Sequence, residues 1–171
     1  MKANGAAVGL LAALLMYGPA TASAAADAAR LDTVERRGAQ VMPFSLERTV
    51  HVFTKTERGG LQQVLVRDEA DVAQIGLVRE HLRHIAGRFA RGDFSDPAQI
   101  HGDDMPGLAE LRRAGPGRIA VTYGELPLGA QVEYATEDPV LIAAIHRWFD
   151  AQLEDHARHA VPGRHEHPDL R

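Results

Sequence analysis

Cysteine is absent from this chain of 171 residues. Disulfide bonds, a nucleophilic thiol and the Cys-x-x-Cys-His motif for covalent haem are therefore excluded. The sequence also lacks a Gly-x-Ser-x-Gly elbow, a phosphate-binding P-loop and a His-Glu-x-x-His zinc motif. No familiar enzyme motif points to a reaction.

Lysine and long apolar runs are scarce, and acidic residues outnumber basic ones. The formal net charge is −4 with histidine neutral, and Lys55 is the only lysine besides Lys2. Because nucleic acids and anionic lipid surfaces attract basic proteins, this balance argues against both as partners. After residue 24, no apolar run approaches the length of a membrane span.

The N-terminal segment has the pattern of a signal peptide. Lys2 precedes an apolar stretch, residues 6–16, that is too short to span a bilayer, and Ala-x-Ala cleavage sites end at Ala22 and Ala24. We expect a periplasmic or secreted protein without membrane contact after cleavage; an uncleaved anchor is the alternative. The expected organisation is a signal peptide (1–24), a flexible leader (25–41), one α+β domain (42–160) and a disordered tail (161–171).

Two pairs of segments have the pattern of β-hairpins. Residues 48–56 and 61–67 flank a Glu-Arg-Gly-Gly turn, and the first of them alternates its side chains as a strand does. Residues 118–126 and 130–136 flank a Pro-Leu-Gly turn in the same way.

Each hairpin precedes a segment typical of an amphipathic helix. In residues 71–89, apolar side chains recur every three or four positions. The second helix is expected to begin with Asp138 as its cap and Pro139 in its first turn, and to run to about His159. The order ββα-loop-ββα predicts an α+β fold with a four-stranded antiparallel sheet and two long helices packed on one face.

An unusual segment joins the two halves. Residues 92–108, GDFSDPAQIHGDDMPGL, contain four aspartates, His101 and Met105, without a helical or strand period. Long irregular connections are usually functional or disordered. We interpret this one as a loop that brings His101 and Met105 to the end of a seam between the two helices; a connector that only caps helices is the alternative.

The chain has nine histidines, several on apolar faces of the predicted helices. Imidazoles that point into a seam between packed helices can meet at one cation, because metal–nitrogen bonds are only about 2.0–2.1 Å long. His146 and His156 lie about 15 Å apart along one helix and cannot share an ion, and we favour His156, with His159 as its neighbour. His84, His165 and His167 are expected to face solvent. The candidate metal ligands are His81, His101, His156, Met105, His51 and His146.

Copper accepts imidazole together with thioether sulfur. The histidines with Met105 therefore favour copper as the cofactor, with zinc or non-covalent haem as alternatives. We expect an exported metal-binding protein that acts as a copper buffer, carrier or sensor.

Two functions of other classes stay open. In the first, an extracytoplasmic enzyme uses His101 with Asp103 or Asp104 as a general base, a common role for a histidine oriented by a carboxylate. In the second, a metal-free adaptor binds a partner protein in the helix seam. The sequence also leaves open that the partner is a second copy of the same chain, which would make a homodimer.

Three stretches, HVFTKT, RGDFSDPAQIHGDDMPGL and HRWFDAQLEDH, resemble a family of small, uncharacterised exported bacterial proteins. Members of this family often carry the label aspartate carbamoyltransferase. Carbamoyltransferases have two α/β domains and a Ser-Thr-Arg-Thr phosphate loop, and the nearest string here, SLERT at residues 45–49, does not match it. The resemblance implies no particular chemistry, but all six candidate ligands lie in or beside the similar stretches.

Overall fold

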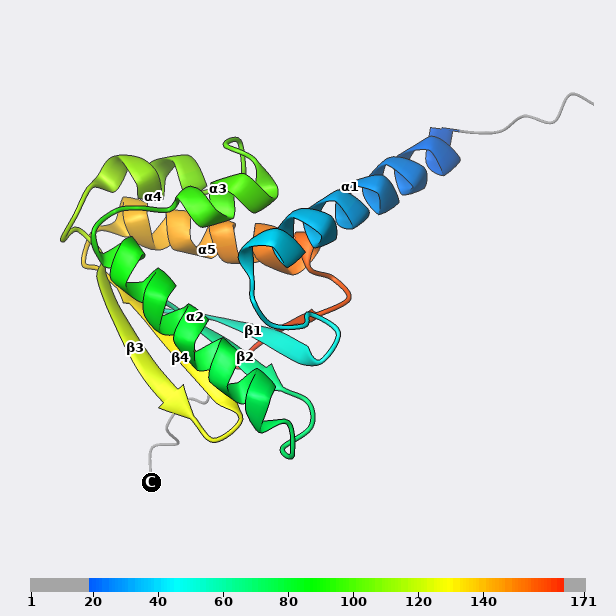
Figure 1. Cartoon of the computed structure of the whole chain (residues 1–171). Coiled ribbons are helices and arrows are strands. Elements are labelled where there is room, and N and C mark those ends of the chain that lie inside the picture. Colours follow the sequence, from blue (N-terminus) through cyan, green and yellow to red (C-terminus); the bar gives the residue numbers. More distant parts are fainter. Residues whose placement is uncertain (1–18, 165–171) are drawn as a thin grey trace, which may run out of the picture.

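The computed structural model describes residues 19–164, with side chains from residue 27 onward. This part of the chain forms five α-helices and five β-strands (Figure 1). In chain order they are α1 (Pro19–Val41), β1 (Thr49–Thr56), β2 (Gly59–Val66), α2 (Val72–Ala90), α3 (Ser95–His101), α4 (Leu108–Ala114), β3 (Ala120–Leu126), β4 (Gly129–Ala135), α5 (Pro139–Asp155) and β5 (Ala160–Pro162).

All five strands belong to one sheet in the order β3-β4-β2-β1-β5. Strands β1 and β2 form one antiparallel hairpin, β3 and β4 form a second, and β2 pairs with β4 to join them. Strand β5 runs parallel to β1 at the edge. The α+β class is confirmed, and both predicted hairpins are present.

The predicted architecture, a four-stranded antiparallel sheet with two long helices, is wrong. The described residues form a five-stranded mixed sheet with five helices. Strand β5 has three residues, too few to show an alternating pattern in the sequence. The end of α5 brings it beside β1, where the His51 amide donates to the His159 carbonyl at 2.8 Å and the Gly163 amide to the Phe53 carbonyl at 2.9 Å.

Helix α3 occupies part of the segment that was predicted to be irregular. Phe94, Pro97 and Ile100 are buried and lie three residues apart, which is a helical spacing. The helix is only seven residues long, so this spacing does not stand out among the surrounding aspartates and glycines. The connection between the two halves is therefore largely a structured, partly buried element.

Helices α2 and α5 cover the same face of the sheet. Helix α2 packs over β3 and β4, and α5 packs over β1 and β2 (Figure 1). Tyr134 of β4 contacts both helices: its ring centre lies 6.2 Å from that of Phe89 in α2 and 5.5 Å from that of Trp148 in α5. The inward residues of the central strands, among them His51, Val64 and Val132, are buried in this core.

The two predicted helices, α2 and α5, begin where the sequence predicts. The Asp71 side chain accepts a hydrogen bond from the Gln74 amide at 3.3 Å, and the Asp138 side chain accepts one from the Val140 amide at 2.9 Å. These bonds satisfy amides that have no partner within the first turn of a helix. Pro139 occupies the first turn of α5, as expected.

Three predictions concern the ends of the chain. Residues 1–18 and 165–171 lie outside the described residues, so the signal peptide falls mainly outside, as do His165 and His167. Residues 25–41, predicted to form a leader, belong to α1, and Val34 in this helix is only 3% exposed. None of the described helices combines the length and the apolar character needed to cross a bilayer.

Candidate functional site

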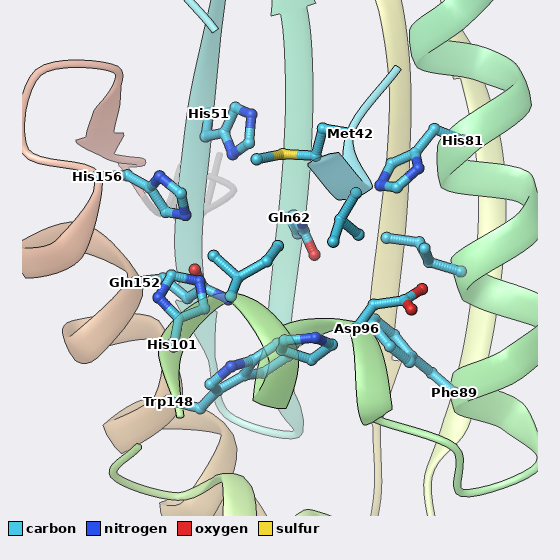
Figure 2. Close-up of a pocket in the computed structure, with 14 residues that line it drawn as sticks. Met42, His51, Gln62, His81, Phe89, Asp96, His101, Trp148, Gln152 and His156 are labelled. Carbon is cyan, nitrogen blue, oxygen red and sulfur yellow. The ribbon is translucent and has the colours of Figure 1, made fainter. Parts of the chain in front are cut away.

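A small cavity lies in the core between the inner face of the sheet and helices α2, α3 and α5 (Figure 2). Residues at the C-terminal end of α1 form another part of its wall. Its volume is about 50 Å³, enough for a few water molecules. The lining residues with polar atoms are His51, Gln62, His81, Asp96, His101, Trp148, Gln152 and His156.

Three histidines from three elements meet on one side of this cavity. His51 lies on β1, His101 ends α3, and His156 follows α5 as its C-cap. The ring centres of His51 and His156 are 5.5 Å apart, and those of His156 and His101 are 4.9 Å apart. All three residues are buried, with exposed fractions of 4–6%. We call them the histidine cluster.

The His101 ring is oriented by a carboxylate. Its Nδ1 lies 2.8 Å from Oδ2 of Asp155, and Arg30 of α1 binds the same carboxylate through Nε at 2.8 Å and Nη2 at 2.9 Å. Burial raises the pKa of Asp155, but the hydrogen bonds from His101 and Arg30 outweigh it and hold the pKa below its ordinary value. The ionised carboxylate only accepts hydrogen bonds, so Nδ1 of His101 is the donor and Nε2 is the ring nitrogen left for another partner.

Burial favours the uncharged form of two imidazoles in the cluster, those of His51 and His156. It lowers the pKa of His51 to about 3, and His81, His159 and His101 contribute to this lowering by repulsion. Burial also lowers the pKa of His156 well below its ordinary value. A neutral imidazole can offer a lone pair to a cation or accept a hydrogen bond.

Two buried nitrogens on the cavity wall have no hydrogen-bond partner within the described part of the chain. They are Nε2 of His51 and Nε1 of Trp148. A buried polar atom without a partner costs about 1–3 kcal/mol, so such atoms are rare in folded proteins. Both residues line the same cavity, whose volume leaves room for a hydrogen-bonding partner such as water.

His81 lies on α2 across the cavity from the cluster (Figure 2). Burial lowers its pKa to about 4, although the negative charge of Asp96 acts in the opposite direction. Its ring packs edge-on against Phe44, with 5.5 Å between the ring centres. His81 therefore shares the cavity with the cluster but stands on the opposite wall.

The structure places the remaining candidate ligands elsewhere. Nε2 of His146 lies 3.0 Å from the carbonyl of Thr56 and 2.9 Å from that of Gly59, so His146 braces the β1–β2 turn. Met105 is buried, at 2% exposure, but does not line the cavity. Of the six candidates, the fold brings His51, His81, His101 and His156 to the cavity.

The base pair expected within the 92–108 segment is also arranged differently. Asp103 forms an ion pair with Arg112, and the carboxylate bound to His101 is Asp155. These partners are 54 residues apart in sequence, and Arg30 is 125 residues from Asp155. No local pattern predicts such pairings.

Met42 is the other site residue that the sequence did not reveal. It directly follows α1, is 7% exposed and lines the cavity. In Figure 2 its sulfur lies between the rings of His51 and His81. A thioether was expected at this site from Met105, and the fold supplies one from Met42, the residue that follows α1.

Comparison with known proteins finds no matching family model, no matching curated protein and no matching solved structure. Among the described residues, no group of three or more histidine or carboxylate side chains is arranged to hold a metal ion as it stands.

Proposed function

We propose that the protein binds a transition-metal ion, copper above all, at the histidine cluster, and acts as a copper buffer or carrier. The observation that carries the proposal is the convergence of three buried histidines, His51, His101 and His156, on one cavity. A single histidine on an apolar face is readily explained as a core residue with a hydrogen bond. Three in contact, one with an unpartnered nitrogen, are costly unless something binds them.

The spacing of the rings supports a shared ion. Two imidazoles bound to one tetrahedral ion through bonds of about 2.0–2.1 Å have ring centres about 5 Å apart. The spacings here are 4.9 Å and 5.5 Å. Binding requires the rings to rotate so that their nitrogens converge, because no group of three is prearranged in the described residues. The adjoining cavity leaves room for that rotation.

The electrostatics support the same role. Metal ligands must be deprotonated, and burial keeps His51 and His156 neutral across the physiological range. The Asp155 carboxylate holds His101 through Nδ1, which is the usual support for a histidine that binds metal through its other nitrogen.

Metal titration of untagged full-length protein tests the proposal. Copper(I), copper(II) and zinc(II) are each titrated against a competing chromophoric chelator, with the wild type and the His101→Ala and His156→Ala variants. Each substitution removes one of three ligands and should weaken copper binding more than tenfold. His84→Ala, at an exposed position of α2, is the matched control and should bind as the wild type does. Wild-type protein that takes up less than a tenth of an equivalent would contradict the proposal.

The His101–Asp155 pair supports a second candidate, a general base acting on a small substrate in the cavity. A histidine held by a carboxylate and facing a partly apolar cavity is a common arrangement for proton abstraction. The same titration separates the two, because the general base requires no metal. Protein that binds no copper but binds a small polar molecule, with loss of that binding in His101→Ala, would favour this second function.

A further inference from the structure

We infer that Met42 supplies a thioether ligand to the histidine cluster and that the bound ion is copper(I) rather than a divalent metal. This inference rests on the proposed function, because it requires a metal at His51, His101 and His156. It adds Met42 as the fourth ligand of the proposed copper site and assigns the copper the oxidation state +1.

The position of Met42 is fixed by the end of α1. Its amide donates to the Gly38 carbonyl at 2.8 Å, which continues the helical bonding by one residue. The buried side chain then lines the cavity, with its sulfur between His51 and His81 (Figure 2). Phe44 follows two residues later, and its ring centre lies 5.9 Å from that of His51 and 5.5 Å from that of His81. The chain after α1 thus places one thioether and one aromatic ring beside these two histidines.

Gly38 provides the space for this side chain. A β-carbon at position 38 would lie 2.7 Å from Cε of Met42, closer than nonbonded carbons approach. Only glycine leaves the methionine methyl group where it is. The helix accepts glycine there at a cost of about 1 kcal/mol relative to alanine.

The charge of the surroundings favours a monovalent ion. Two carboxylates lie at or next to the cavity, and each is bound by an arginine: Asp155 by Arg30 at 2.8 Å, and Asp96 by Arg88 at 2.6 Å, although Arg88 also binds Asp93 at 2.8 Å. The proposed ligands are three imidazoles and a thioether. An imidazole that binds a metal is deprotonated, so none of these four ligands carries a charge. The cost of transferring an ion into a buried site grows with the square of its charge. A neutral ligand set in a buried pocket therefore opposes a divalent ion far more than a monovalent one.

Ligand softness leads to the same ion. Thioether sulfur is a soft donor that copper(I) accepts, whereas zinc takes thiolate, imidazole and carboxylate ligands. Copper(I) also tolerates three or four ligands without a strict geometry, which suits rings that must rotate into place.

Substitution of Met42 by leucine tests the inference. Leucine has a similar volume, so the packing of the core is largely kept, and only the sulfur is lost. Affinities for copper(I), under anaerobic reducing conditions, and for zinc(II) are measured by chelator competition for the full-length wild type, Met42→Leu, Met105→Leu and His156→Ala. Met105 is the matched control because it is also buried but does not line the cavity. X-ray absorption of the copper(I) protein reports sulfur coordination directly.

We expect Met42→Leu to weaken copper(I) binding by about tenfold or more, to leave zinc(II) binding within about threefold and to remove the sulfur signal. Met105→Leu should change none of these. If Met42→Leu leaves copper(I) affinity and the absorption spectrum unchanged while His156→Ala abolishes binding, the inference is wrong and the proposed function stands. An equal loss for both metals indicates a packing effect and also overturns the inference. If His156→Ala has no effect on copper(I), the proposed function itself fails.

Discussion

Asp155 is the residue on which the histidine cluster depends most. It binds His101 on one side and Arg30 on the other, and its side chain is 6% exposed whereas that of Arg30 is 50% exposed. The buried bond to His101 fixes the ring, whereas the bond to Arg30 is partly screened by solvent. The two partners should therefore differ in their effect on the site.

We expect Asp155→Asn to weaken copper binding by about 10–100-fold, the usual effect of losing a carboxylate that orients a metal-binding histidine. Arg30→Gln should weaken it less than about threefold, because the carboxylate and its bond to His101 remain. Chelator competition with copper measures both. Asp103→Asn is the control, since its ion pair with Arg112 lies outside the cavity. Equal losses in Asp155→Asn and Asp103→Asn would mean that Asp155 does not orient a ligand.

At the scale of elements, helix α4 is held against α5 by a close backbone approach. Gly107, the N-cap of α4, has a φ of 80°, in the left-handed region. A β-carbon there would lie 2.1 Å from the carbonyl oxygen of Ala144 and 2.8 Å from the amide nitrogen of Trp148. Any side chain at this position pushes α4 away from the helix that carries Trp148 and, farther along, His156.

We expect Gly107→Ala to lower the free energy of unfolding by about 2–4 kcal/mol, through backbone strain and a clash that cannot relax. Gly76→Ala is the matched control. Gly76 lies in α2, and a β-carbon at this position would have no heavy atom of a neighbouring residue within 4 Å, so alanine should stabilise that helix by up to about 1 kcal/mol. Urea denaturation of the two variants measures both effects, and a Gly107→Ala protein as stable as the wild type would contradict this account of the contact.

At the scale of the whole molecule, the histidines around the cavity make stability depend on pH. Burial lowers the pKa of His51 to about 3 and that of His81 to about 4, and it lowers that of His156 as well. In the unfolded chain a histidine binds a proton below about pH 6.5. Between these values the unfolded state binds more protons than the folded state, so the free energy of unfolding falls as the pH falls.

We expect the metal-free protein to be markedly less stable at pH 5 than at pH 7.5, with His51 alone contributing roughly 2 kcal/mol of the difference. The pKa of Asp155 is lowered, so its contribution is lost only under more acidic conditions. Urea denaturation at both pH values measures the difference. His84→Ala, at an exposed position, should keep the full dependence, whereas His51→Gln should reduce it. Stability that stays constant or rises toward pH 5 would contradict the burial of neutral histidines.

The sequence by itself determined the features that depend on neighbouring residues. Both hairpins, the apolar stripe of α2 and the cap at Asp138 follow from local periodicity and from a side chain that satisfies a nearby amide. His81 and His156 reach the cavity because histidines beside the apolar face of a helix are placed near the core.

Only the tertiary structure decided how these pieces meet. The alternation in β1 places His51 and Val52 on opposite faces without saying which face is inward; the paired sheet turns His51 and Phe53 inward. Strand β5 exists because α5 delivers three residues to the edge of β1. Met42 and Asp155 join the site through contacts between segments far apart in sequence. Such contacts form only when complete helices and strands pack against one another. Their stability depends on residues from distant segments, so it cannot be read from any short stretch of the sequence.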